Sequence, residues 1–183
     1  MSKNCTYRLK EPFTYEDKTY SELILDFDRL TGNDAMAIET EMQQNGTGLI
    51  QNEAWDGGYQ TAVASKASGI PEDVLLAMPL AVNVGIRRKV RKYLTEGVNT
   101  IANEIGEKLN SLTGDMLQMV DNELRAERHT VTGDVALDTL YCLRLAVKAS
   151  DMAEKQMLDL PMNEFLNVKM AVRYFLLLAD WGA

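Results

Sequence analysis

The chain contains the same sequence unit twice. Residues 30–94 align with residues 112–176 without a gap, at a constant offset of 82 residues. Both copies begin Leu-Thr-Gly, and about a quarter of the aligned positions are identical. The identities include Glu41 with Glu123, Asp56 with Asp138, Tyr59 with Tyr141, Lys66 with Lys148 and Arg91 with Arg173. A repeat this long predicts a small folding unit made twice, not a short stacking motif of a solenoid.

Each copy carries helix signals in the same order. Thr31 and Thr113 suit the N-cap position, and Pro79 and Pro161 suit the start of a last helix. Helices are predicted at about residues 33–44, 52–67, 71–77 and 80–96 in the first copy, and at about 115–127, 134–151 and 162–180 in the second. We therefore expect two homologous helical repeats that pack together.

The N-terminal segment has no counterpart in the second copy and carries β signals. Leu23, Leu25 and Phe27 alternate with a period of two, and the polar run at residues 16–18 predicts a turn. The sequence therefore predicts a β-hairpin within residues 7–27. The expected fold class is mainly α with this N-terminal β-hairpin.

The predicted organisation has four parts. They are an N-terminal hairpin at residues 1–29, a first helical repeat at 30–97, a helical connector at 98–111 and a second helical repeat at 112–183. Apolar residues keep helical spacing from Ile86 to Leu109, so the last helix of the first repeat is expected to run on into the connector. Gly97 would mark a kink in that long helix.

Composition narrows the class of partner. The net charge is −8, which disfavours general binding of nucleic acid or anionic membranes and favours protein partners. Cys5 and Cys142 lie far apart, which indicates no disulfide framework and a reducing cytoplasm. The N-terminus lacks the apolar stretch of a signal peptide, and the apolar run at residues 74–86 is too short to span a bilayer.

The sequence carries no familiar catalytic motif. His129 is the single histidine and is expected to be an exposed loop residue without metal ligands around it. The acidic residues Glu39, Glu41 and Asp56 recur as Asp121, Glu123 and Asp138. Such repetition on amphipathic helices indicates a solvated face or an internal cap rather than an acid–base pair. We expect no enzyme activity, no metal and no cofactor.

One basic cluster stands out in this acidic chain. Arg87, Arg88, Lys89, Arg91 and Lys92 fall on one predicted helix, mostly opposite its apolar face. The cluster is either a solvated face or a docking surface for an acidic partner segment. Nucleic acid is a weaker third interpretation, because the rest of the chain is acidic.

The copies diverge most in their last helix. In the second copy the segment 165–181 is apolar nearly all round, so it must be buried on more than one side. It either fills a groove between the repeats or leaves an apolar patch exposed for a partner. The predicted partner surface comprises Phe165, Met170, Tyr174, Phe175, Leu178 and Trp181, with Arg87, Arg88 and Arg91 of the first copy as a second surface.

The first half of the chain resembles a known protein family. The segments Tyr7-Arg-Leu-Lys-Glu-Pro, Leu30-Thr-Gly-Asn-Asp and Lys66-Ala-Ser-Gly-Ile-Pro, in this order, resemble the tail assembly chaperones of long-tailed and contractile-tailed phages. The resemblance covers about the first 95 residues, and its motifs are folding signals, so no binding residue carries over. The second copy departs from the single-unit pattern of that family, and it would be a fused second chaperone unit or a unit with a different role.

The resemblance implies a function without catalysis. Such chaperones bind the long, apolar tape-measure protein, keep it soluble and help recruit tail-tube subunits. The family acts in the host cytoplasm, is absent from the mature virion and is often encoded with a frameshifted longer product. The alternatives are a structural tail or connector subunit, and an enzyme of unrecognised type. The sequence does not decide whether the protein forms a homo-oligomer.

Overall fold

The computed structural model describes residues 4–47, 50–97, 99–131 and 134–179. It forms two compact units, Met1–Glu96 and Gly97–Ala183, here called unit 1 and unit 2. Each unit holds one copy of the repeat. The protein is mostly helical with an N-terminal antiparallel hairpin, which confirms the predicted fold class.

Unit 1 begins with the predicted hairpin. Strand β1 (Cys5–Tyr15) pairs antiparallel with β2 (Lys18–Leu25), and Glu16 takes a positive φ of 51° in the turn between them. The ladder shifts register between Arg8 and Phe13, the stretch that contains Pro12, which cannot donate a ladder hydrogen bond. Strand β2 packs against the helices of unit 1 and buries Tyr20, Leu23 and Leu25.

The repeat appears in the structure as four helices in each unit. After the short 3-10 helix η1 (Phe27–Arg29), unit 1 contains α1 (Gly32–Gln44), α2 (Gly57–Ser68), α3 (Glu72–Ala77) and α4 (Leu80–Thr95). Unit 2 contains α5 (Thr100–Leu109), α6 (Gly114–Ala126), η2 (Val135–Leu137), α7 (Thr139–Lys148), α8 (Glu154–Leu158) and α9 (Met162–Ala179). The helices α6, α7, α8 and α9 each begin 82 residues after α1, α2, α3 and α4. Helix α8 is not among the helices predicted from the sequence.

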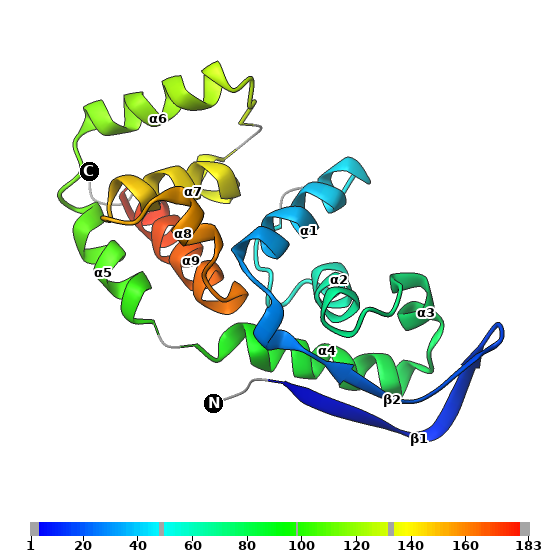
Figure 1. The fold of residues 1–183 in the computed structure, drawn as a ribbon. Coiled ribbons are helices and arrows are strands. Elements are labelled where there is room, and N and C mark those ends of the chain that lie inside the picture. Colours follow the sequence, from blue (N-terminus) through cyan, green and yellow to red (C-terminus); the bar gives the residue numbers. More distant parts are fainter. Residues whose placement is uncertain (1–3, 48–49, 98, 132–133, 180–183) are drawn as a thin grey trace. The chain divides into compact units, whose positions relative to one another are not determined.

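The predicted continuous helix across the connector is wrong. Helix α4 ends at Thr95, the backbone at Glu96 is extended, and α5 begins at Thr100. Helix α5 lies along α9 in unit 2, as Figure 1 shows, and buries Ala102, Ile105 and Leu109. The connector is therefore part of the core of unit 2, because its apolar face packs on the last helix of that unit.

Helix α2 is the centre of unit 1. The helices α1, α3 and α4 and the strand β2 all pack against it. Most of its residues are buried, among them Tyr59, Val63 and Ala64. Its small residues, such as Ala62 and Ala64, let the neighbouring elements approach closely.

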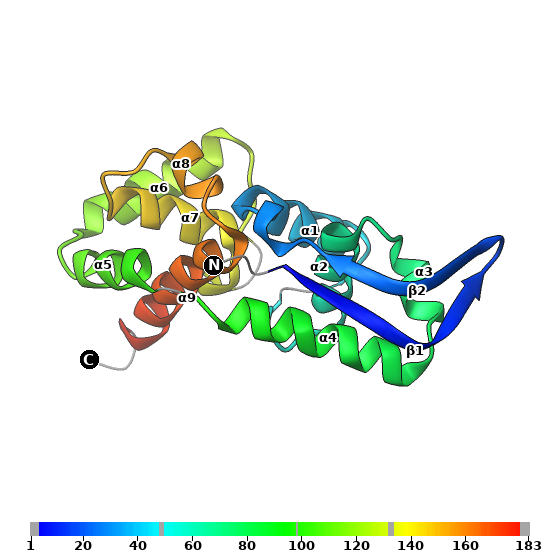
Figure 2. The same ribbon diagram turned by 60° about the horizontal axis from the view of Figure 1, so that its bottom comes forward.

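The hairpin approaches α4 at a glycine. Strand β1 runs beside α4 in Figures 1 and 2, and the ring of Tyr7 occupies the space that a Cβ at Gly85 would need. The equivalent residue in unit 2, which has no hairpin, is Asn167. There the side-chain nitrogen of Asn167 lies 2.6 Å from the position of a Cβ at Gly97, the residue that leads into α5. Each unit thus covers the same face of its last helix with a different element.

This contact predicts opposite effects for two glycine substitutions. Gly85→Ala should lower the free energy of unfolding, because the overpacking cost of about 1–3 kcal/mol exceeds the gain in helix propensity. Gly106→Ala in α5 is the control, because no atom lies within 4 Å of its Cβ position. That variant should gain about 0.5–1 kcal/mol. Urea unfolding followed by circular dichroism measures both, and equal stabilisation by the two substitutions would refute the Tyr7 contact.

Candidate functional site

The recurring aspartates serve as helix caps. Asp56 Oδ1 accepts the backbone N–H of Tyr59 at 2.7 Å, and Asp138 Oδ1 accepts that of Tyr141 at 2.9 Å. These bonds fix the first turns of α2 and α7. Both helices begin later than predicted. Each starts directly after its capping aspartate, and the residues before that aspartate are not part of the helix. The interpretation of this repeated carboxylate as an internal cap is confirmed.

A second recurring contact is an ion pair. Lys66 Nζ lies 3.3 Å from Glu41 Oε1 in unit 1, and Lys148 Nζ lies 2.6 Å from Glu123 Oε1 in unit 2. The pairs join the first helix of each repeat to its second helix. They belong to the structural framework of the repeat. The caps explain one of the three repeated carboxylates, and these ion pairs explain a second.

The third repeated carboxylate faces a buried tyrosine. In unit 2 the Tyr141 hydroxyl is hydrogen-bonded to Asp121, and burial followed by the charge of Asp121 raises the pKa of Tyr141 to about 12. In unit 1, burial raises the pKa of Tyr59 well above its ordinary value, and the negative charge of Glu39 is the second largest cause. Both phenols stay protonated at neutral pH, so neither tyrosine is poised as a base.

His129 is not the exposed residue that the sequence indicated. The side chain is half-buried, and its Nε2 lies 2.8 Å from Asp138 Oδ2. The imidazole therefore ties the loop after α6 to the capping residue of α7. Unit 1 has Thr47 at the equivalent position, so this link belongs to unit 2 alone among the two copies.

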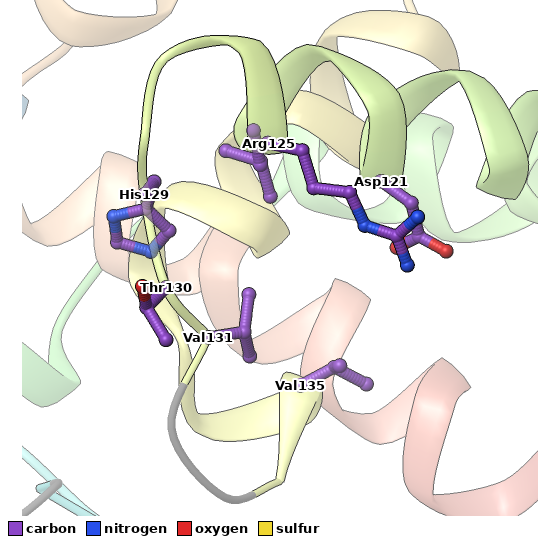
Figure 3. Close-up of a pocket in the computed structure, with 7 residues that line it drawn as sticks. Asp121, Arg125, His129, Thr130, Val131 and Val135 are labelled. Atoms are coloured by element: carbon purple, nitrogen blue, oxygen red, sulfur yellow. The ribbon is translucent and has the colours of Figure 1, made fainter.

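Figure 3 shows a cavity of about 340 Å³ beside this histidine. It is lined by Asp121, Leu124, Arg125, His129, Thr130, Val131 and Val135. The Arg125 side chain extends along α6 towards Asp121, whereas His129 and Thr130 come from the loop. Two of the lining side chains have partners within unit 2, because Asp121 is hydrogen-bonded to Tyr141 and His129 to the capping residue Asp138.

Other groups that could carry chemistry are sparse. Within the described ranges, no three His, Cys, Asp or Glu side chains are placed to hold a metal ion together. Burial raises the pKa of the Cys5 thiol, opposed by the charges of Lys89 and Lys92. A thiol with a raised pKa is a poor nucleophile. No helix in the described part of the chain is long and apolar enough to cross a bilayer.

Helix α9 divides into a buried part and an exposed end. Phe165 is 2% exposed and lies in the core of unit 2, so its assignment to a partner surface is corrected. Phe175 is half-buried. Trp181, the last residue of the predicted surface, lies outside the described residues.

The exposed end of α9 carries an apolar stripe. It consists of Met170, Tyr174, Leu177 and Leu178, which share one helix face at the spacing i, i+4, i+7 and i+8. Tyr174 is 57% exposed, Leu177 38% and Leu178 66%, whereas Met170 is half-buried. We call these four residues the α9 stripe. Leu177 was not among the residues predicted for the partner surface.

The first copy shows that the fold does not require this stripe. The equivalent residues in unit 1 are Arg88, Lys92 and Thr95 of α4 and Glu96 directly after it, and all four are exposed. Lys92 pairs with Glu96 at 3.6 Å along the helix. The same turn of the repeat is therefore polar in unit 1 and apolar in unit 2, although both copies build the same helix.

The basic cluster of unit 1 forms a second distinct surface. Arg88 is exposed, whereas Arg87 and Arg91 are half-buried. The guanidinium carbon of Arg91 lies 4.3 Å from the ring centroid of Trp55, which is itself 63% exposed. The sequence did not indicate that Trp55 joins this cluster, because the two segments lie apart in the chain and meet only when α2 packs on α4.

No protein-family model matches the chain, and no curated protein or solved structure is significantly similar to it. The two copies of the repeat can still be compared with each other. Residues that recur in both copies serve the fold, whereas positions that differ were free to diverge.

The two caps predict unequal losses of stability. Asp56→Ala should cost about 1 kcal/mol, because it removes a single N-cap bond. Asp138→Ala should cost about 2 kcal/mol, because it also removes the bond to His129. Asp138→Asn retains an oxygen for the cap and should cost less than Asp138→Ala. Urea unfolding measures all three, and equal losses for the two alanine variants would mean that the His129 bond contributes nothing.

Tyr141 predicts a loss of stability at alkaline pH. Its pKa is about 12 in the fold and about 10 in an unfolded chain, so the fold favours the protonated phenol. This stabilisation is complete below pH ~10 and is lost as the pH rises through ~12. Tyr141→Phe should be less stable at pH 8 by about 0.5–1.5 kcal/mol, and its deficit should shrink as the pH rises towards 11. A deficit that stays constant over this range would contradict the prediction.

Proposed function

We propose that this chain is a non-catalytic phage tail assembly chaperone. It would bind the tape-measure protein, keep it soluble and help recruit tail-tube subunits. The proposal rests on the family resemblance of about the first 95 residues. It also rests on the α9 stripe, which is the observation that carries the binding function.

The α9 stripe supports binding for a physical reason. Exposed apolar side chains in a contiguous group are unfavourable in water and mark interaction surfaces. Unit 1 has polar residues at the equivalent positions and builds the same helix, so the repeat folds without apolar side chains there. An apolar stripe on a helix suits a partner helix with an apolar face of its own.

Tape-measure proteins, as the resemblance implies, are long, apolar and helical, so they offer that partner chemistry. The chaperone would cover apolar helices of the tape-measure protein while its own acidic surface, at a net charge of −8, keeps the complex in solution. It would act in the host cytoplasm and leave before the virion matures. A structural tail or connector subunit is the alternative, because it too would need an apolar contact surface.

The proposal predicts that a variant built from the first copy loses binding but folds. Tyr174→Lys, Leu177→Thr and Leu178→Glu together install the residues of α4 at the end of α9. The chain is co-expressed with the largest apolar helical protein encoded nearby in its genome. The soluble fraction of that partner and its recovery in a pull-down are then measured. The wild-type chain should make the partner soluble, and the triple variant should lose most of this effect.

Matched controls separate binding from folding. Gln118→Lys with Asn122→Glu adds the same two charges to exposed positions of α6 and should leave binding unchanged. Circular dichroism and urea unfolding should show that all variants fold. If the wild-type chain neither binds nor solubilises the partner and instead appears in purified particles, it is a structural subunit. If light scattering shows that the stripe variant only dissociates a homo-oligomer, the stripe is a self-association surface.

A further inference from the structure

Three arginines of unit 1 have no ionic partner in the part of the chain that the structure describes. Among the described residues, no carboxylate lies within salt-bridge distance of Arg87, Arg88 or Arg91, whereas Lys92 on the same helix pairs with Glu96. The chain has 27 acidic residues against 19 Lys and Arg residues, so carboxylates are abundant. A cluster left unpaired in such a chain is therefore a notable feature of this surface.

Two of these arginines also leave a buried donor unsatisfied. The Nε atoms of Arg87 and Arg91 are shielded from solvent and have no hydrogen-bond partner. The equivalent of Arg91 in unit 2 is Arg173, which is 3% exposed and donates its Nε–H to the carbonyl of Ala136 at 3.1 Å. The repeat thus has an internal way to satisfy this arginine, and unit 1 does not use it.

Two of the guanidinium groups lie beside the start of helix α2. Arg87 Nη1 lies 2.7 Å from the position of a Cβ at Gly57, the first residue of α2, and Arg91 stacks on Trp55 just before that helix. The N-terminus of a helix carries a partial positive charge. Asp56 at the N-cap offsets part of it but makes no ion pair with either arginine. Two cations are therefore gathered where the helix itself already favours an anion.

Arg144 in unit 2 indicates which anion fits. Its Nε is also unpaired, yet its terminal nitrogens bind the carboxylates of Glu127 and Glu154. Carboxylates accept two bonds from the planar guanidinium, which gives strong, directional pairs. Trp55 adds an exposed apolar surface beside the cations, which suits a polypeptide. An extended nucleic acid is less suitable, because the net charge of −8 repels a polyanion.

We infer that Arg87, Arg88, Arg91 and Trp55 form a docking site on unit 1 for an acidic segment of a protein partner. Carboxylates of Asp or Glu in that segment would pair with the three guanidinium groups, and an apolar neighbour would contact Trp55. The site shares no residue with the α9 stripe, so it does not depend on the proposed chaperone function.

The test uses the full chain and a defined peptide. A ten-residue Glu-rich peptide is titrated into the 15N-labelled protein, and the Nε–Hε signals of Arg87 and Arg91 are followed by NMR. Both signals should shift in a saturable way. The same peptide with Gln in place of Glu should leave them unchanged. A peptide that produces no shift, or a Gln peptide that binds as well, overturns the inference.

Charge-matched variants locate the site. Arg88→Gln and Lys92→Gln each remove one exposed positive charge from α4, but of the two only Lys92 has an ionic partner among the described residues. Arg88→Gln should weaken binding of the Glu-rich peptide about tenfold, and Lys92→Gln by less than about twofold. Because Arg88 is exposed, its variant should fold normally, which circular dichroism checks. Equal weakening by both variants would mean general charge attraction.

A further titration distinguishes the two classes of anion. A ten-nucleotide oligothymidine is added to the same labelled protein under the same salt conditions. It should bind more weakly than the Glu-rich peptide. Tighter binding of the oligonucleotide would overturn the inference and assign the cluster to nucleic acid.

Discussion

Each unit depends on a second helix that is buried along much of its length and fixed at its first turn by an aspartate. Asp56 and Asp138 hold the starts of α2 and α7, and the other elements of each unit pack around these helices. A buried helix has to satisfy its polar side chains internally. Thr61 does so by donating its hydroxyl to the Gly57 carbonyl at 2.9 Å. The cap, the tyrosine that follows it and the ion pair to the first helix recur in both copies.

The two copies share their inner helices but not the element that covers them. Unit 1 uses a hairpin that buries Tyr20 and Leu23, and unit 2 uses α5, which buries Ala102 and Ile105. The second pair lies 82 residues after the first, so the buried positions keep their place in the repeat although one element is a strand and the other a helix. Gly85 accommodates the hairpin. The repeat therefore has an apolar face that another element must bury. The sequence that precedes each repeat determines whether that element is a hairpin or a helix.

The two copies have acquired surfaces of different chemical character. The end of α4 is charged and the end of α9 is apolar. Arg87 and Arg91 of α4 have no ionic partner among the described residues, whereas the cations at their places in unit 2 are buried. Arg173 and Lys169 occupy in unit 2 the places of Arg91 and Arg87, and both are almost fully buried. Under the two proposals above, unit 2 offers an apolar surface and unit 1 a cationic surface. Duplication then supplies two kinds of partner contact on one framework.

The sequence by itself determined the duplication, the hairpin with its turn, and the order of the repeat helices, because alternation, capping residues and helical spacing are local signals. The tertiary structure alone decided where packing overrides those signals. Helix α4 ends at Thr95, although the apolar periodicity continues beyond it, because α5 packs on α9 as a helix of unit 2. Phe165 is core whereas Leu177 is surface, since the apolar pattern of α9 continues around the helix and only its neighbours select the buried face. His129 reaches Asp138, and Arg91 reaches Trp55, because helix packing joins segments that no local pattern connects.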